Sequence, residues 1–246
     1  MKYKILVITL FFMSNIVLSQ AGKIQYEVKL GIDLKEVDKT YVEFFKEIVD
    51  YGNNQQFQLL FNNKSSSFKY VEKLNNDTNF DKNADLIART FINSSSDVYV
   101  DYIIKKVVLK EPDGTLIEKK YDPAGWEITN ESKIIGTYLS YKAKKIVYYT
   151  SAKGQSKNMD VIAWFAPNLP YPYGPIDFYG LPGLILELTQ NKATFLATKI
   201  DLVEEEIKID FPKGKTITKE EYDKKLESSM GGVLIGKKRE MEKDKQ

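Results

Sequence analysis

Short runs in which apolar and polar residues alternate recur along most of this chain. Ile24, Tyr26, Val28 and Leu30 are separated by single, mostly polar residues, and a period of two is typical of a half-buried β-strand. The same kind of pattern predicts strands near residues 57–61, 68–70, 98–102, 107–109, 116–117, 143–150, 159–166, 184–188 and 193–200, with a further strand at 207–211. The sequence therefore predicts a β-rich protein.

Two segments have helical spacing instead. Apolar residues recur at intervals of three and four over residues 41–49, where Asp38 is a suitable N-cap and Gly52 ends the pattern. Thr218 and Glu221 form a capping box at the start of a second helix, expected over 218–230. Residues 74–85 are rich in Asn and Asp, which predicts an exposed loop.

Turn signals separate these elements at fairly regular intervals, and Pro112-Asp113-Gly114 is a clear example. No internal repeat or interdomain linker interrupts the series. We therefore expect a mainly β fold of the α+β class, a single curved antiparallel sheet or half-barrel with one or two packed helices.

The amino-terminal segment predicts a secretory signal peptide over residues 1–19. Lys2 and Lys4 precede a mostly apolar run that ends near Val17, and Ser19 suits a cleavage position. An uncleaved membrane anchor is the alternative, but the run is shorter than the roughly 20 apolar residues of a membrane span. The remaining residues, 20–246, are expected to form one domain. It would be soluble, not membrane-spanning after cleavage, and periplasmic or extracellular.

Composition limits the chemistry of this protein. The chain has no histidine and no cysteine, which excludes the Ser-His-Asp triad, cysteine nucleophiles, disulfide bonds and histidine-based zinc sites. We predict no metal and no cofactor. Without Lys2 and Lys4, 34 basic residues balance 34 acidic ones, so no field of one sign attracts nucleic acid, and no nucleic-acid partner is expected.

A proline-rich segment, residues 167–183, lies between two predicted strands and holds five of the eight prolines. Proline fixes φ and removes a backbone donor, so this loop should be stiff and should not pair as a strand. It ends in a motif that we expect to be needed for backbone geometry rather than for chemistry. The residues of this structural motif are Pro175, Gly180, Leu181, Pro182, Gly183, Leu184 and Ile185. The residues at 184–188 are almost all apolar, which predicts a strand covered on both faces.

The motif Gly180-Leu181-Pro182-Gly183-Leu184-Ile185 resembles the signature of the GLPGLI family, also called the Porph_ging domain. The residues that lead into it extend the resemblance: Trp164, Pro170, Gly174, Pro175, Phe178 and Tyr179. The family consists of secreted bacterial proteins without an established biochemical activity. The resemblance therefore implies an exported protein of β-rich fold and no particular chemistry.

Aromatic residues of this loop and its preceding strand are the candidate ligand-binding residues: Trp164, Tyr171, Tyr173, Phe178 and Tyr179. In one interpretation they form the rim of a groove for an apolar or sugar-like ligand. In the other they fold inward and close one end of the sheet, because buried aromatic rings contribute strongly to a core.

Catalytic candidates are few. Asp160, Asp177 and Glu187 flank the loop and could form the carboxylate pair of a glycosidase, although surface carboxylates are the usual interpretation. Ser140 and Lys142 share one face of a predicted strand, which would allow a Ser–Lys dyad, but an ordinary surface lysine accounts for the pattern. We predict no catalytic residue among them.

The residues favour an exported, non-catalytic binding or carrier module of the bacterial envelope. Its partner would be a hydrophobic small molecule, a peptide or an outer-membrane protein. The alternatives are a carboxylate-based hydrolase, in which the carboxylates would converge in a cleft, and a structural envelope protein, which would have no cleft and an exposed apolar patch.

Overall fold

A computed structural model describes residues 21–72, 81–150 and 156–228 of the chain. The predicted signal peptide and its cleavage position lie outside these residues, so both stay predictions. Within the described ranges one sheet of twelve strands has the order β12-β6-β5-β4-β3-β2-β1-β11-β10-β9-β8-β7. All neighbouring strands are antiparallel except β12 and β6, which are parallel.

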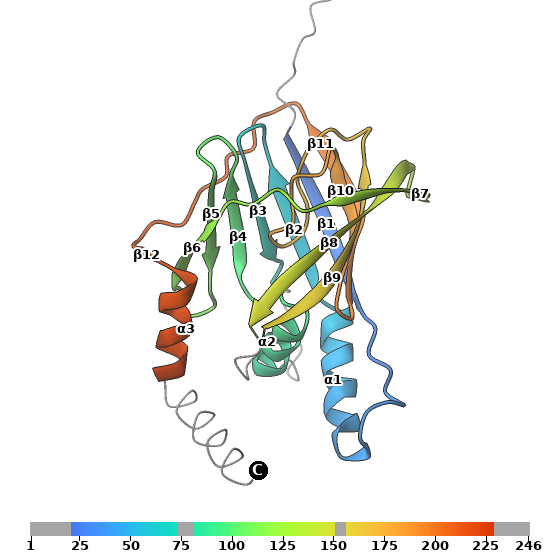
Figure 1. The fold of residues 1–246 in the computed structure, drawn as a ribbon, viewed down its shortest axis with the longest axis vertical. Helices are drawn as coiled ribbons and strands as arrows, with labels where there is room; N and C mark the ends of the chain where they lie inside the picture. Colours follow the sequence, from blue (N-terminus) through green and yellow to red (C-terminus); the bar gives the residue numbers. More distant parts are fainter. Residues whose placement is uncertain (1–20, 73–80, 151–155, 229–246) are drawn as a thin grey trace, which may run out of the picture.

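Figure 1 shows the elements along the chain. The strands are β1 (Ala21–Leu30), β2 (Gln56–Phe61), β3 (Ser65–Tyr70), β4 (Asp97–Asp101), β5 (Lys106–Lys110), β6 (Leu116–Lys120), β7 (Glu127–Ile135), β8 (Tyr138–Thr150), β9 (Ser156–Ala166), β10 (Leu184–Gln190), β11 (Ala193–Val203) and β12 (Thr216–Ile217). The helices are η1 (Lys39–Tyr41), α1 (Val42–Asn53), α2 (Lys82–Phe91) and α3 (Lys219–Ser228).

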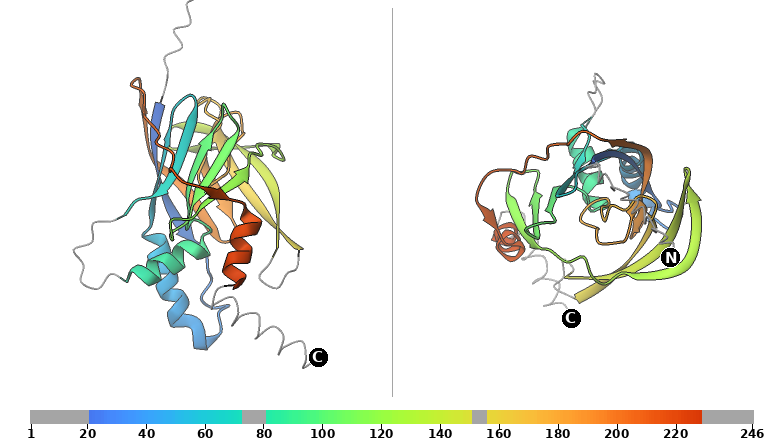
Figure 2. Two further views of the ribbon diagram at one scale, coloured as in Figure 1. Left: turned by 90° about the vertical axis from the view of Figure 1, so that its left-hand side faces the viewer. Right: turned by 90° about the horizontal axis from the view of Figure 1, so that it is seen from above.

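The sheet curves on itself without closing, as the right-hand view in Figure 2 shows. β1 lies in the middle and pairs with β2 on one side and β11 on the other. The two edges of the sheet, β12 with β6 and β7 with β8, face each other across a gap that we call the seam (Figure 2, right). The predicted fold class, a mainly β protein with one curved sheet and packed helices, is confirmed.

The concave side of the sheet holds the core. Tyr26, Phe57, Phe68 and Phe195, from four neighbouring strands, are almost fully buried. Phe57 and Phe68 stack with ring centroids 5.3 Å apart, while Phe195 meets Phe57 edge-on at 5.5 Å. The first contact joins adjacent strands and the second crosses over β1, so the rings pack the strands together on this side of the sheet.

Helices α1 and α2 lie together at one end of the sheet (Figure 1). Asp38 does accept a hydrogen bond from the Thr40 amide, but it caps η1, whereas the N-cap of α1 is Tyr41, which makes no side-chain cap bond. Helix α2 was not predicted, and its residue Asp85 is buried rather than part of an exposed loop. The Asp85 carboxylate accepts a hydrogen bond from Gln55 at 2.9 Å and lies 3.3 Å from Arg89.

The last helix begins as predicted. The Glu221 amide donates to the Thr218 hydroxyl, and the Thr218 amide donates to the Glu221 carboxylate. The strand predicted at 207–211 is wrong, because that segment has no strand hydrogen bonds. Ile209 and Phe211 instead pack on a small cluster of buried residues on the outer face of β4 to β6. No described helix is long and apolar enough to cross a membrane.

Candidate functional site

The proline-rich loop lies inside the curve of the sheet (Figure 2, right). The Tyr173 hydroxyl donates to the Asn62 carbonyl at 2.6 Å, and the Tyr26 hydroxyl donates to the Ile185 carbonyl at 2.6 Å. Both bonds are buried and link the loop or its following strand to strands far away in the sequence. The loop is therefore part of the packed interior.

A tyrosine cluster joins the loop to the neighbouring chain: Tyr171, Tyr173 and Tyr179 belong to the loop, and Tyr102 and Tyr121 pack against it. The rings of Tyr102 and Tyr173 are 4.6 Å apart, and those of Tyr121 and Tyr179 stack at 4.9 Å. Burial raises the pKa of Tyr173 and of Tyr179 to about 12. These hydroxyls therefore stay protonated at alkaline pH values at which exposed tyrosines ionise, as expected for hydrogen-bonding groups of a core.

The two glycines of the motif are required for different reasons. Gly180 has φ +95, and a Cβ there would lie 2.6 Å from the Pro123 carbonyl oxygen. Gly183, in contrast, does not have a positive φ. A Cβ at Gly183 would instead lie 2.4 Å from the Ala166 carbonyl oxygen, so close backbone approach excludes a side chain.

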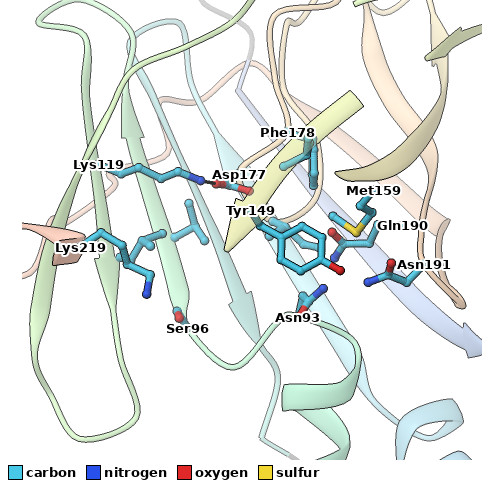
Figure 3. Close-up of a pocket in the computed structure, with 14 residues that line it drawn as sticks. Asn93, Ser96, Lys119, Tyr149, Met159, Asp177, Phe178, Gln190, Asn191 and Lys219 are labelled. Atoms are coloured by element: carbon cyan, nitrogen blue, oxygen red, sulfur yellow. Dashed lines mark hydrogen bonds and ion pairs between the residues drawn. The ribbon is translucent and has the colours of Figure 1, made fainter. Parts of the chain in front are cut away.

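Below this packed region lies an inner cavity of 440 Å³. Figure 3 shows Lys119, Asp177 and Phe178 on one side of it and Asn93, Gln190 and Asn191 on the other. Apolar side chains from β4, β5, β8, β9 and the loop make up much of its wall: Val98, Leu109, Val147, Met159, Ile176 and Phe178. The volume lies within the range of about 300–1,000 Å³ that is usual for ligand pockets.

An ion pair between Lys119 of β6 and Asp177 of the loop borders the inner cavity. The Asp177 carboxylate raises the pKa of the Lys119 ammonium, so this lysine stays charged. The residue before Asp177 is Ile176, which has φ +58. Positive φ is rare for a β-branched residue and marks local strain.

The opposite end of the inner cavity is polar. The Gln190 side chain donates to the Ile92 carbonyl at 3.1 Å, which fixes its amide at the cavity wall. Ser96 also lines the cavity and donates to the Glu111 carboxylate at 2.8 Å. Burial raises the pKa of Glu111. Polar groups thus lie at both ends of an apolar space, an arrangement that suits an amphipathic molecule.

The structure does not bring the five predicted aromatic residues to one rim. Tyr171, Tyr173 and Tyr179 belong to the tyrosine cluster, and Phe178 lines the inner cavity. Trp164 lies on the opposite face of β9 from the buried Val161, Ala163 and Phe165. There the Lys133 ammonium lies 4.3 Å from the centre of the Trp164 ring. Ligand binding by these residues stays a prediction.

The three candidate carboxylates also lie apart. Only Asp177 lines the inner cavity. Glu187 accepts hydrogen bonds from Lys133 on the face of the sheet that carries Trp164. Asp160 is exposed and lies four residues from Trp164, the β9 partner of Glu187, which is roughly 13 Å along a strand. The spacing of a glycosidase pair, about 5–9.5 Å, does not arise between Asp160 and Glu187.

Ser140 and Lys142 have other partners. Lys142 donates to the Glu131 carboxylate at 2.9 Å, and the Ser140 hydroxyl donates to the Tyr138 carbonyl at 3.3 Å. Neither residue lines the inner cavity. Over residues 21–72, 81–150 and 156–228, no group of three or more acidic side chains could hold a metal ion.

Sequence patterns alone missed most of the residues that line the inner cavity. Only Asp177 and Phe178 among them were site candidates. The others come from strands that are distant in sequence, and their alternating pattern indicates a buried face without distinguishing a filled core from a hollow one.

The comparison with protein families concerns the loop and its preceding strand. Residues 150–187 match a family described as a protein of unknown function, Porph_ging. The chain carries the signature of this family. The resemblance carried by the motif is thereby confirmed. No curated protein matches the chain.

Two solved structures share the fold. Both are structures of PNGF-II, in two space groups, and they superpose with TM-scores of 0.52 and 0.51. They cover 85% of this chain at 12% and 10% sequence identity. The chain corresponds to about a third of the PNGF-II chain, 33% in one structure and 34% in the other. At this identity the likeness concerns the fold alone.

Proposed function

We propose that this protein is an exported, non-catalytic binding or carrier module that holds a small amphipathic ligand in the inner cavity. The observation that carries the proposal is a cavity of 440 Å³ on the inner side of the curved sheet, with largely apolar walls and polar groups at both ends. Apolar walls supply affinity, and a few polar groups orient the ligand.

The alternatives have less support. A carboxylate-based hydrolase needs two carboxylates that converge on a cleft, and of the three candidates only Asp177 lines the inner cavity. Its carboxylate is engaged by Lys119. A purely structural envelope protein has no need of a ligand-sized cavity with apolar walls. The similarity to PNGF-II favours none of these functions, because one fold supports many.

The proposal is tested by filling the inner cavity. Leu109 lines it from β5, and the larger side chain of Leu109→Trp should obstruct it. The control is Lys110→Trp, since Lys110 is the next residue of β5, is exposed and does not line the cavity. Both variants are titrated with anilinonaphthalene sulfonate, an amphipathic dye whose fluorescence rises in apolar sites.

We expect wild type and Lys110→Trp to bind the dye equally and Leu109→Trp to bind it at least tenfold more weakly. Thermal melts show whether the variants remain folded. Equal binding by all three folded proteins would contradict a ligand site in the inner cavity. Native mass spectrometry of protein isolated from bacterial envelopes then identifies the natural ligand.

A further inference from the structure

A second hollow adjoins the inner cavity at the seam between the two ends of the sheet. This outer cavity has a volume of 370 Å³ and is lined from β6 by Lys119 and Lys120 and from β8 by residues 145–148. β6 and β8 are not neighbours in the sheet. The outer cavity therefore lies where the curved sheet stays open.

The two cavities share one boundary. Lys119, Val147, Asp177 and Phe178 line both of them. The pairing of β7 with β8 ends at the pair Glu127–Lys144, so β8 beyond that point has no β7 residue beside it. A molecule that enters at the seam thus meets this boundary before it reaches the apolar walls of the inner cavity.

The charge at the seam is positive. Three lysines and two aspartates line the outer cavity, and the ion pair of Lys119 with Asp177 neutralises one charge of each sign. Lys120 and Lys145 remain beside one further acidic residue, Asp122, and the Lys145 ammonium lies 5.8 Å from the centre of the Trp126 ring. Asp122 accepts a hydrogen bond from the Ala124 amide at 3.1 Å, and no ion pair within the described ranges joins either lysine to a carboxylate.

We infer that the ligand is an anionic, single-chain amphiphile. Its charged head lies in the outer cavity near Lys120 and Lys145, and its apolar chain passes Val147 and Phe178 into the inner cavity. This inference rests on the proposed function and adds the charge and direction of the ligand. It follows from the order of the two spaces. The outer one is lined by two lysines that form no ion pair among the described residues, whereas the lysines of the inner one, Lys119 and Lys219, pair with Asp177 and Asp223 and much of its wall is apolar.

The test compares three probes with one alkyl chain and different heads: dodecanoate, dodecanol and dodecyltrimethylammonium, each below its critical micelle concentration. Isothermal titration calorimetry measures their affinities for the full chain. We expect dodecanoate to bind most tightly, with an affinity that falls as salt is added because exposed charges are screened.

Two charge-reversal variants show where the charged head group of the ligand binds. Lys145→Glu should weaken dodecanoate about tenfold and leave dodecanol within twofold. Lys144→Glu is the matched control, since it changes the net charge equally at the next residue of β8, which does not line the outer cavity. It should leave all three affinities within twofold, and both variants should melt near the wild-type temperature.

The possible results separate the two proposals. If the three probes bind equally, or the cationic one binds best, the inferred ligand charge is wrong while the binding function stands. If the two lysine variants weaken dodecanoate equally, the head does not lie at the seam and the inference is also wrong. If wild type binds none of the probes, the binding function itself is contradicted.

Discussion

The interior of the curved sheet is filled in one region and hollow in the other. In the filled region the loop of residues 167–183 packs its tyrosines against Phe61 and Tyr102, and buried hydroxyls bond to backbone carbonyls. In the hollow region residues of β4, β5, β8 and β9 face an open space. The motif of residues 180–185 lies in the filled region, and the groups that would suit a ligand lie in the hollow one.

If the proposed function holds, this difference means that the signature motif is not itself the ligand site. Gly183 allows the backbone to pass the Ala166 carbonyl, and Gly180 turns the chain against Pro123. The loop that they position supplies Asp177 and Phe178 to the wall of the inner cavity. The motif therefore contributes by positioning the loop, which fills one part of the interior and forms part of the wall of the inner cavity.

The largest expected effect comes from a side chain at Gly183. Gly183→Ala should reduce the free energy of unfolding by about 3 kcal/mol, since its Cβ would overlap a backbone oxygen that cannot move alone. The control is Gly114→Ala, where φ is +83 but nothing lies within 4 Å, so only about 1 kcal/mol should be lost. Urea unfolding measures both, and equal losses would contradict the close approach.

Removal of one buried hydroxyl should have a smaller effect in the filled region. Tyr173→Phe deletes the donor to the Asn62 carbonyl and should cost about 1–2 kcal/mol of stability. Tyr148→Phe is the control, because Tyr148 is 72% exposed. Chemical denaturation that finds the two variants equally stable would show that the bond to Asn62 contributes nothing.

Alkaline pH should lower the stability that the filled region contributes to the fold. The folded-state pKa of Tyr173 and Tyr179, about 12, lies above the ordinary 10.0, so the folded state keeps protons that the unfolded chain has lost. Their contribution to stability is fully present below pH 10 and is lost as the pH rises toward 12. Denaturation at stepwise pH measures this loss, which Tyr173→Phe should reduce; an unchanged pH profile would contradict it.

The smallest stability effect is expected at the boundary of the hollow region. Asp177→Asn removes the carboxylate that pairs with Lys119 and should change stability by about 0.5 kcal/mol, because the lysine is half exposed. The same change leaves Lys119 free to attract an anion, so dodecanoate should bind more tightly, by about threefold. Calorimetry that shows weaker binding would indicate that Asp177 itself holds the ligand.

Much of the fold could be predicted from the sequence, because alternating apolar and polar residues indicate a strand with one buried face. β1 and β10 appear as predicted, and the capping box of Thr218 and Glu221 fixes the start of α3. Strand β7 was not predicted, since its residues are largely exposed on both faces and lack an apolar period. Helix α2 was missed although Asp81, Ala84 and Ala88 have the spacing of a cap and a buried stripe.

The candidate site was less predictable for a physical reason. The stiff loop and its motif are local features, so the sequence indicates them directly. The inner cavity depends on how far apart β5 and β9 lie once the sheet has curved, and no local pattern encodes that distance. The position of Trp164 on the other face of β9 could have been predicted, because Val161, Ala163 and Phe165 alternate with it and are buried.

The most direct test of the account is a crystal structure of the protein with ω-bromododecanoate. The anomalous signal of bromine locates the end of the alkyl chain without regard to the quality of the surrounding density. We predict a bromine site in the inner cavity, near Leu109 and Met159, with the carboxylate toward Lys145. A bromine site at Trp164 or outside the curve of the sheet would contradict the assignment of the inner cavity as the ligand site.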